Sequence, residues 1–304
     1  MSRQRRPKYA SLPRALEAKP FSVAEALKLG VGYSRLRADD LIVPALGARM
    51  VGRPDNLITA AQVYAAVIRR PHAFSHLTAL AIWGLPLPAG RRDPATGLHI
   101  TVAMDDSRVR RPGVVAHRGL ESRRVLTHLG LKVTAPLDTW LDCAPLLTRD
   151  DLVAVGDALT NEPFDYSPDS FIRLADEATG RRGVRRAREA AQLVRVGSRS
   201  PKESKMRCVF HDHGLPEPEL NVNIYTDAGA FISCNDFVWR DRRVVCEYDG
   251  DWHRTDRDRW QVDRERRARL EDLGWTYVEC ASNATRPGRA QDELLARLKR
   301  LLLW

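Results

Sequence analysis

The chain has 304 residues, of which 43% are hydrophobic, with a formal net charge of +10 and a pI of about 9.7. This length predicts about two domains. The absence of an 18-residue apolar run excludes a transmembrane helix, and we expect no signal peptide and a cytoplasmic location. The five scattered cysteines form no CxxC pair, which excludes a zinc ribbon and a disulfide framework.

The basic excess lies in the first 196 residues, which hold 30 basic and 20 acidic side chains, whereas residues 197–304 hold 19 of each. Such an excess favours an anionic partner, with nucleic acid first and a membrane surface second. An Arg-rich chain is also basic without binding DNA, so composition alone leaves both interpretations open.

Sequence patterns divide the chain into five stretches with a mixed α and β composition, for which we expect an α/β (α+β) fold class. They are a basic arm at 1–20, a winged helix-turn-helix at 21–54, a mixed α/β domain at 55–168, an Arg-rich helical connector at 169–199 and an αβββαβ domain at 200–304.

In the first structured stretch, Ser22 can cap a helix that ends at Gly30. Ser34 can cap a second short helix at Arg35–Asp40, and the alternating residues 41–51 predict a β-wing. The exposed side of the second helix would be the recognition surface for DNA. Its candidate DNA contacts are Tyr33, Ser34, Arg35 and Arg37.

In the middle stretch, the periodicity predicts four helices, at 57–69, 74–83, 135–144 and 150–159, and two strands, at 98–103 and 114–117. His72 and His76 are four residues apart, but they lack the central glutamate and the third ligand of a zinc protease. No phosphate-cradling GxxxxGK[ST] motif occurs, so an NTPase motor is not supported.

The connector is strongly basic between residues 181 and 199. One interpretation is a solvated helix face, and the other is a phosphate-contacting strip that would make DNA binding depend on salt. The strip's candidate DNA contacts are Arg181, Arg182, Arg185 and Arg186.

The last stretch begins with Ser200-Pro201-Lys202-Glu203, which is typical of a capped helix start. A helix to about residue 213 is followed by strands near 219–226, 230–239 and 243–249, a helix at 256–273, a strand at 275–280 and a helix at 289–303.

Three carboxylates converge in this prediction. Alternation places Asp236 on the face of its strand that carries Ile232 and Val238, and it places Glu247 and Asp249 on one face of the next strand. Like charges this close raise one another's pKa unless a divalent cation neutralises them. Oxygen ligands favour Mg²⁺ or Mn²⁺, which can promote phosphodiester hydrolysis. The alternative is a surface hairpin with ordinary charges.

The run of Glu203, Asn235-Asp236-Phe237 and Glu247-Tyr248-Asp249-Gly250 with His253 resembles the PD-(D/E)XK superfamily, and in particular very-short-patch-repair-type endonucleases. The resemblance covers about 100 residues and implies Mg²⁺-dependent DNA cleavage. It assigns Asp236 and Glu247 to the metal, with Asp249 as a further candidate ligand and Glu203 extending the site. Asp249 stands where this superfamily usually has lysine, so we expect His253 to be the general base.

The stretch from Pro20-Phe21-Ser22-Val23 through the wing, with Ser75-His76-Leu77-Thr78-Ala79 and Val133-Thr134-Ala135-Pro136, is similar to AbiEi-type antitoxins. This resemblance implies DNA binding and, in some members, repression or neutralisation of a toxin.

Together these patterns predict a Mg²⁺- or Mn²⁺-dependent DNA endonuclease with an N-terminal DNA-binding part, in a setting of defence or repair. The alternative is a non-catalytic, antitoxin-like DNA-binding regulator with a degenerate nuclease fold, and a third class is RNA hydrolysis. DNA is the expected partner, no membrane is expected, and a homodimer or a toxin partner is compatible with the sequence.

Overall fold

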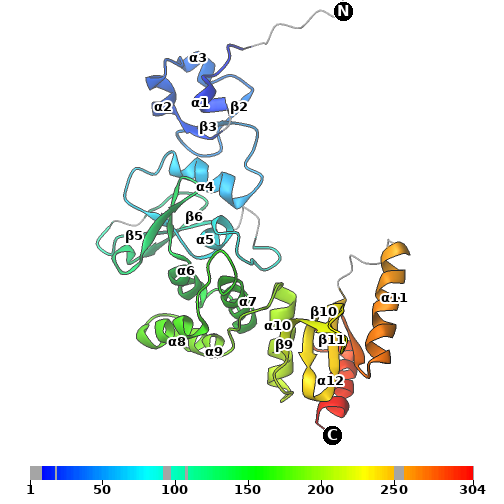
Figure 1. Ribbon diagram of the computed structural model, residues 1–304. Helices are drawn as coiled ribbons and strands as arrows, with labels where there is room; N and C mark the ends of the chain where they lie inside the picture. The colour runs from blue at the N-terminus through cyan, green and yellow to red at the C-terminus, as the bar shows by residue number, and fades with distance from the viewer. Residues whose placement is uncertain (1–8, 18, 92–96, 107–108, 250–256, 304) are drawn as a thin grey trace, which may run out of the picture. The chain divides into compact units, whose positions relative to one another are not determined.

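The computed structural model describes residues 9–17, 19–91, 97–106, 109–249 and 257–303. It divides into two compact units, an N-terminal unit (Met1–Cys143) and a C-terminal unit (Ala144–Trp304), each a mixture of helices and sheets (Figure 1). The predicted α+β class is therefore confirmed. Among the described residues, no helix combines the length and the apolar character that crossing a bilayer requires.

The N-terminal unit contains two β-sheets, each packed against helices. Its elements are α1 (Arg14–Glu17), β1 (Phe21–Ser22), α2 (Val23–Lys28), α3 (Tyr33–Leu36), β2 (Leu41–Ile42), β3 (Ala48–Val51), α4 (Leu57–Ala65), β4 (Ala73–Phe74), α5 (His76–Ile82), β5 (Leu98–Val102), β6 (Val114–Arg118), a 3₁₀ turn (Leu120–Ser122), β7 (Val125–His128), β8 (Leu131–Thr134) and α6 (Pro136–Cys143).

Two short helices and a three-stranded sheet occupy the stretch predicted as a winged helix-turn-helix. The Ser22 hydroxyl accepts the backbone N–H of Glu25 at 3.1 Å and caps α2, and Gly30 follows the helix in the left-handed region with φ of 80°. β3 lies between β1 and β2 and pairs antiparallel with both. Apolar side chains from α1, α2 and α3 form the small core beneath this sheet.

The second helix of this motif differs from the prediction. α3 starts at Tyr33 and ends at Leu36, with Gly32 in extended backbone at its N-cap, so the expected Ser34 cap and the helix over Arg35–Asp40 are wrong. Asp40 lies beyond the helix, where its carboxylate binds the Arg35 guanidinium.

The second sheet of the N-terminal unit has five strands in the order β6-β5-β4-β8-β7, and it packs against α4 and α5. The expected strands β5 and β6 are confirmed, and they pair in parallel. The sequence analysis missed β4, β7 and β8. Phe74 belongs to β4, where it pairs with Ile100 and Val133, so the helix expected from Phe74 starts only at His76.

The C-terminal unit carries the αβββαβ arrangement. Its elements are α7 (Arg149–Leu159), α8 (Pro168–Glu177), α9 (Val184–Ala191), α10 (Pro201–Asp212), β9 (Glu219–Tyr225), β10 (Phe231–Trp239), a 3₁₀ turn (Arg240–Arg242), β11 (Val244–Asp249), α11 (Arg257–Asp272), β12 (Thr276–Ala281) and α12 (Arg289–Leu302). The predicted order from α10 to α12 is confirmed.

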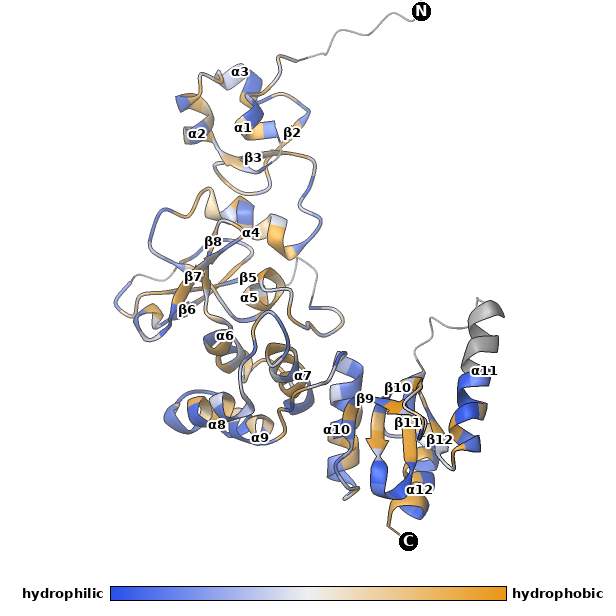
Figure 2. Cartoon of the chain, viewed as in Figure 1, coloured by the Kyte–Doolittle hydropathy of each residue, from blue (hydrophilic) through white to orange (hydrophobic). Residues whose placement is uncertain are grey.

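The sheet of this unit runs β12-β11-β10-β9, with β12 parallel to β11 and the other pairs antiparallel. α10 and α12 pack on one face over Phe237 and Cys246, and α11 packs on the other over Val238 and Val245. Figure 2 shows the apolar strands of this sheet beside the polar α11. Helices thus cover both faces of the sheet, so residues that point to either face are mostly apolar, with single acids between them.

A buried ion pair joins α7 to α10. Arg207 Nη2 lies 2.8 Å from Asp157 Oδ2, and the two side chains are 3% and 1% exposed. Asp157 also accepts the backbone N–H of Arg195 at 2.8 Å. These bonds fix α10, which carries Glu203 in its first turn.

Candidate active site

Two of the predicted acids lie on neighbouring strands, next to the last residues that pair. Phe237 of β10 pairs with Cys246 of β11, and Asp236 and Glu247 are their neighbours along the two strands. At this point the Asp236 carboxylate accepts the backbone N–H of Tyr248 at 2.8 Å, and this bond fixes its orientation at the end of the pairing.

Asp236 is half-buried, and its surroundings disfavour its negative charge. Burial, which removes water from the carboxylate, is the largest cause of its raised pKa, and the negative charge of Glu203 raises it further. The N–H of Tyr248 and the charges of Arg266 and Arg199 act in the opposite direction. A cation at this position would therefore stabilise the ionised form of Asp236.

Glu247 already has a cationic partner. The Arg266 guanidinium of α11 binds Glu247 Oε2 in a short ion pair, and the Tyr277 hydroxyl donates to the same oxygen at 3.2 Å. The Glu247 side chain is 13% exposed and that of Arg266 is 27% exposed. Arg266 thus supplies positive charge where the sequence analysis expected a metal ion.

Glu203 is held at the start of α10, buried at 7% exposure. The Ser200 hydroxyl accepts the N–H of Glu203 at 3.2 Å, so the expected cap is confirmed. The Glu203 carboxylate accepts the backbone N–H of Arg199 at 2.9 Å and the Asn221 amide at 2.7 Å. The Glu203 carboxylate is therefore bound by Arg199, before the helix, and by Asn221 of β9, and these two bonds fix its position.

For two further predicted site residues the structure describes no side chain. Asp249 ends β11, but its side chain is not among the described ones, and His253 is outside the described residues. Within the described part of the chain, Glu203, Asp236 and Glu247 do not bring three ligand atoms within 4.8 Å of one another.

The residues present fit a hard divalent cation in their donor chemistry. Asp236 and Glu247 offer carboxylate oxygens from adjacent strands, which suit Mg²⁺ or Mn²⁺. Burial disfavours the negative charge of Asp236, and Arg266 balances that of Glu247, so added positive charge would stabilise the ionised form of Asp236. Arg266 binds Glu247 Oε2, so an ion that used this oxygen would compete with the guanidinium.

Sequence reasoning did not identify Asn221 or Tyr277 as part of this cluster. Strand alternation puts Tyr277 on the face of Val245 and Glu247, but this follows only from the parallel register, in which Val245 pairs with Tyr277. That register joins strands separated by α11 and is not visible in local periodicity.

The predicted recognition helix is only partly available for DNA. Tyr33 is 60% exposed, and Ser34 and Arg37 are exposed as well. Arg35, in contrast, is 13% exposed in its side chain and donates to Asp40 at 2.8 and 2.7 Å and to the Ala10 carbonyl at 2.6 Å. Arg35 therefore holds the start of the chain against α3.

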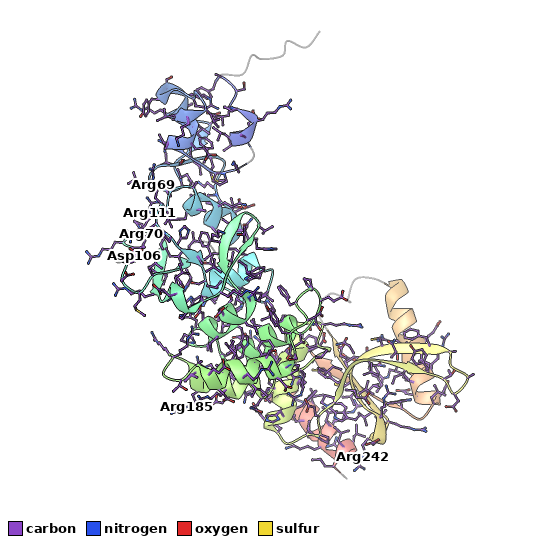
Figure 3. All side chains as sticks on the ribbon, turned by 60° about the vertical axis from the view of Figure 1, so that its left-hand side comes forward. Arg69, Arg70, Asp106, Arg111, Arg185 and Arg242 are labelled. Carbon is purple, nitrogen blue, oxygen red and sulfur yellow. The ribbon has the colours of Figure 1, made fainter. Side chains whose placement is uncertain are left out.

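The connector arginines also divide into two groups. Arg182 and Arg185 are exposed, and Arg185 is labelled on α9 in Figure 3. Arg186 instead donates to the carbonyls of Ala144 and Leu147, both at 2.8 Å, and Arg181 is half-buried. Structural hydrogen bonding therefore occupies Arg186, and Arg182 and Arg185 remain as candidate phosphate contacts.

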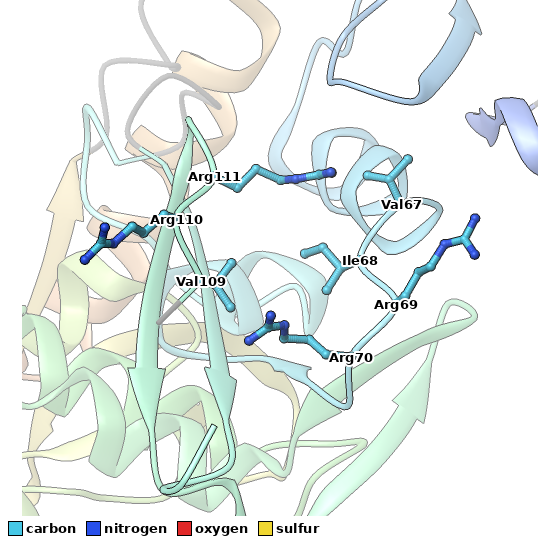
Figure 4. Close-up of a pocket in the computed structure, with 7 residues that line it drawn as sticks. All are labelled: Val67, Ile68, Arg69, Arg70, Val109, Arg110 and Arg111. Carbon is cyan, nitrogen blue, oxygen red and sulfur yellow. The ribbon is translucent and has the colours of Figure 1, made fainter. Parts of the chain in front are cut away.

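A basic pocket of about 520 Å³ lies in the N-terminal unit, lined by Val67, Ile68, Arg69, Arg70, Val109, Arg110 and Arg111. Arg70 and Arg111 extend across it in Figure 4, whereas Arg69 and Arg110 extend away. Arg70 pairs with Asp106 at 2.9 Å. Among the described residues, the buried Nη1 of Arg111 has no hydrogen-bond partner, which favours an anion here.

Two curated proteins of Mycobacterium tuberculosis are similar to this chain. They are the uncharacterized protein MT2308 of strain CDC 1551 / Oshkosh and the uncharacterized protein Rv2248 of strain ATCC 25618 / H37Rv. Each is 34% identical over 211 residues, which cover 67% of this chain and 74% of the mycobacterial protein. No family model matches the chain, and no solved structure matches it.

Proposed function

We propose that this chain, which belongs to the same family as the two mycobacterial proteins, is a Mg²⁺- or Mn²⁺-dependent endonuclease that hydrolyses phosphodiester bonds in DNA. The proposal rests on one observation: Asp236 and Glu247 lie on adjacent strands of a β12-β11-β10-β9 sheet, each next to the last paired residues, Phe237 and Cys246. This order and these acids are what the PD-(D/E)XK resemblance implies.

The chain's own residues have separate roles in this proposal. Asp236 and Glu247 hold the cation, and the N–H of Tyr248 keeps Asp236 in position. Glu203 adds negative charge from α10, anchored by Asn221. When bound, the divalent cation would polarise the phosphodiester and make a water molecule more acidic. Asp249 and His253 are proposed for the site from the sequence alone.

Arg266 acts as a gate on metal binding in this proposal. Without a cation its guanidinium neutralises Glu247, and with a cation and a phosphate present it turns to the added negative charge. A guanidinium on the mobile end of a long side chain can make this exchange without movement of the backbone.

DNA would contact the basic surfaces of both units, each considered by itself. In the N-terminal unit these are the exposed side chains of α3 and the pocket around Arg111, where a phosphate would satisfy the buried guanidinium. In the C-terminal unit they are Arg182 and Arg185. We place the activity in the cytoplasm, with a homodimer or a toxin partner as further possibilities to be tested.

The direct test is nicking of supercoiled plasmid with Mg²⁺, with Mn²⁺ or with EDTA. Wild type should nick only with a divalent cation, and Asp236→Ala should be inactive while its circular dichroism is unchanged. Single-stranded RNA is included as a substrate, because cleavage of RNA alone would replace DNA as the target.

A second candidate function is a metal-independent DNA-binding regulator with a degenerate nuclease fold. The Glu247–Arg266 ion pair favours it, because a permanent guanidinium at that position makes a cation unnecessary. A regulator would shift DNA in EDTA, would not nick it, and would show no change in melting temperature with Mg²⁺.

A further inference from the structure

Three histidines from distant parts of the sequence meet inside the N-terminal unit. His76 is the first residue of α5, His99 lies in β5 and His117 lies in the neighbouring strand β6. One ring nitrogen of each lies within 4.8 Å of the other two. This is the one such group of potential metal ligands in the described part of the chain.

We propose that His76, His99 and His117 form a transition-metal site that binds one Zn²⁺ per chain through three imidazole nitrogens, separate from the acidic site of the C-terminal unit. Tetrahedral Zn²⁺ with Zn–N bonds of about 2.0–2.1 Å holds its nitrogens about 3.3 Å apart. The ligand nitrogens lie within 4.8 Å of one another, and His99 Nδ1 and His117 Nε2 are 2.9 Å apart, so each separation changes by no more than about 1.5 Å to reach this geometry.

The three imidazole rings contact one another through a hydrogen bond and through ring stacking. His99 Nδ1 and His117 Nε2 share a hydrogen bond at 2.9 Å, and the His76 and His117 rings stack with centroids 3.6 Å apart and an interplanar angle of 16°. A metal ion lies in the plane of each imidazole that binds it, so binding requires His76 and His117 to rotate out of this stack. His117 is half-buried and lines a cavity of about 510 Å³, which gives it room to turn and gives the ion a route from solvent.

Burial also acts on the two strand histidines. Reinforced by His117 and Arg91, it lowers the pKa of His99 to about 4, and it lowers the pKa of His117 as well. Neutral imidazole is the form that binds metal.

A second layer of hydrogen bonds orients the ligands. His76 Nδ1 lies 2.9 Å from the Ser75 hydroxyl, which accepts a hydrogen bond from the Thr101 hydroxyl at 2.8 Å, so this chain of contacts holds the His76 ring. The Thr78 hydroxyl accepts the backbone N–H of His99 at 2.8 Å and fixes that strand against α5. Metal-binding histidines are commonly held in this way through their second nitrogen.

The backbone at His76 supplies independent support. His76 has φ of 52°, in the left-handed region that a non-glycine residue adopts only at a cost in free energy. This conformation turns the first side chain of α5 towards β5 and β6. Such strain is retained where the surrounding structure requires one side-chain position.

The test is a Zn²⁺ titration of the metal-stripped full chain by calorimetry, with Mg²⁺ in excess to occupy the acidic site. Wild type should bind one Zn²⁺, and His99→Ala should lose this binding. Ser75→Ala should weaken it by about 10–100-fold, as expected for loss of an orienting partner. Because His99 is buried and its variant could fail to fold, half-buried His117→Gln is measured in parallel, and Co²⁺ absorption reports the coordination geometry.

Two controls locate the ion. A variant with both Asp236→Asn and Glu247→Gln should bind Zn²⁺ like wild type. So should a variant with both His211→Ala and His213→Ala, which removes two histidines at the end of α10. Absence of Zn²⁺ binding by the folded wild type would overturn the proposal. So would binding that survives in folded His117→Gln and disappears in either control variant.

Discussion

Replacing Arg266 with glutamine tests whether Glu247 is a cation ligand or only the partner of a permanent ion pair. Glu247 is 13% exposed, and its Oε2 is bound by Arg266, so the substitution leaves a largely buried carboxylate without its guanidinium. Breaking a fully buried pair costs about 3–5 kcal/mol, and the 27% exposure of Arg266 reduces this to about 2 kcal/mol. For a chain of this size, the melting temperature without metal should fall by roughly 4–8 °C.

The same substitution should strengthen metal binding. In wild type a cation must displace Arg266 from Glu247, whereas in Arg266→Gln that cost of about 2 kcal/mol is absent, so Mn²⁺ should bind about 30-fold more tightly. Scanning calorimetry with and without Mn²⁺ measures both effects, and the melting temperature of the variant should recover when Mn²⁺ is added.

Arg289→Gln on α12 is the matched control. Arg289 pairs with Glu293 four residues later at 2.6 Å, and the two side chains are 90% and 63% exposed, so its loss should leave both the melting temperature and Mn²⁺ binding unchanged. If Arg266→Gln is destabilised by the same amount with and without Mn²⁺, the two acids hold no cation and the reasoning is refuted.

Four other outcomes follow from the structure. Burial raises the pKa of Asp236, so Asp236→Asn should be more stable than metal-free wild type at pH 8, and urea unfolding should show this advantage disappearing as pH falls below the ordinary aspartate range. Arg207→Ala should lower the free energy of unfolding by about 3–5 kcal/mol through loss of the buried Asp157 pair, against about 1 kcal/mol or less for Arg149→Ala at the more exposed Asp212 pair. Changing both Arg182 and Arg185 to glutamine should reduce the slope of log K against log salt for DNA by about 1.8, and an unchanged slope would remove them from the interface. Arg37→Ala should weaken DNA binding without loss of stability, whereas Arg35→Ala should lower the melting temperature first, and the reverse result would contradict the hydrogen bonds that occupy Arg35.

Much of the fold was predictable because its local signals are strong. Ser200-Pro201 starts α10, Gly214 and Gly274 follow α10 and α11 in the left-handed region, and apolar alternation defines β10 and β11. The strands β4, β7 and β8 were not predicted because they are only two to four residues long and their pairing depends on other segments of the chain.

The candidate site was predictable in its strands but not in its contacts. Alternation correctly separated Asp236 from Phe237 and Glu247 from Cys246, because the sheet has a different helix on each face. The pairing of Arg266 with Glu247 depends on how α11 crosses the sheet, which no local pattern encodes. The histidine cluster was missed for the same reason, since His99 and His117 approach His76 only through the β5–β6 pairing.

The most direct measurement is the rate at which wild type and Glu247→Gln nick supercoiled plasmid in Mg²⁺ and in EDTA. Wild type should nick the plasmid in Mg²⁺ alone, and the folded Glu247→Gln protein should nick it in neither condition. Equal nicking by both proteins, or DNA binding by wild type in EDTA with no nicking in Mg²⁺, would contradict the proposed function.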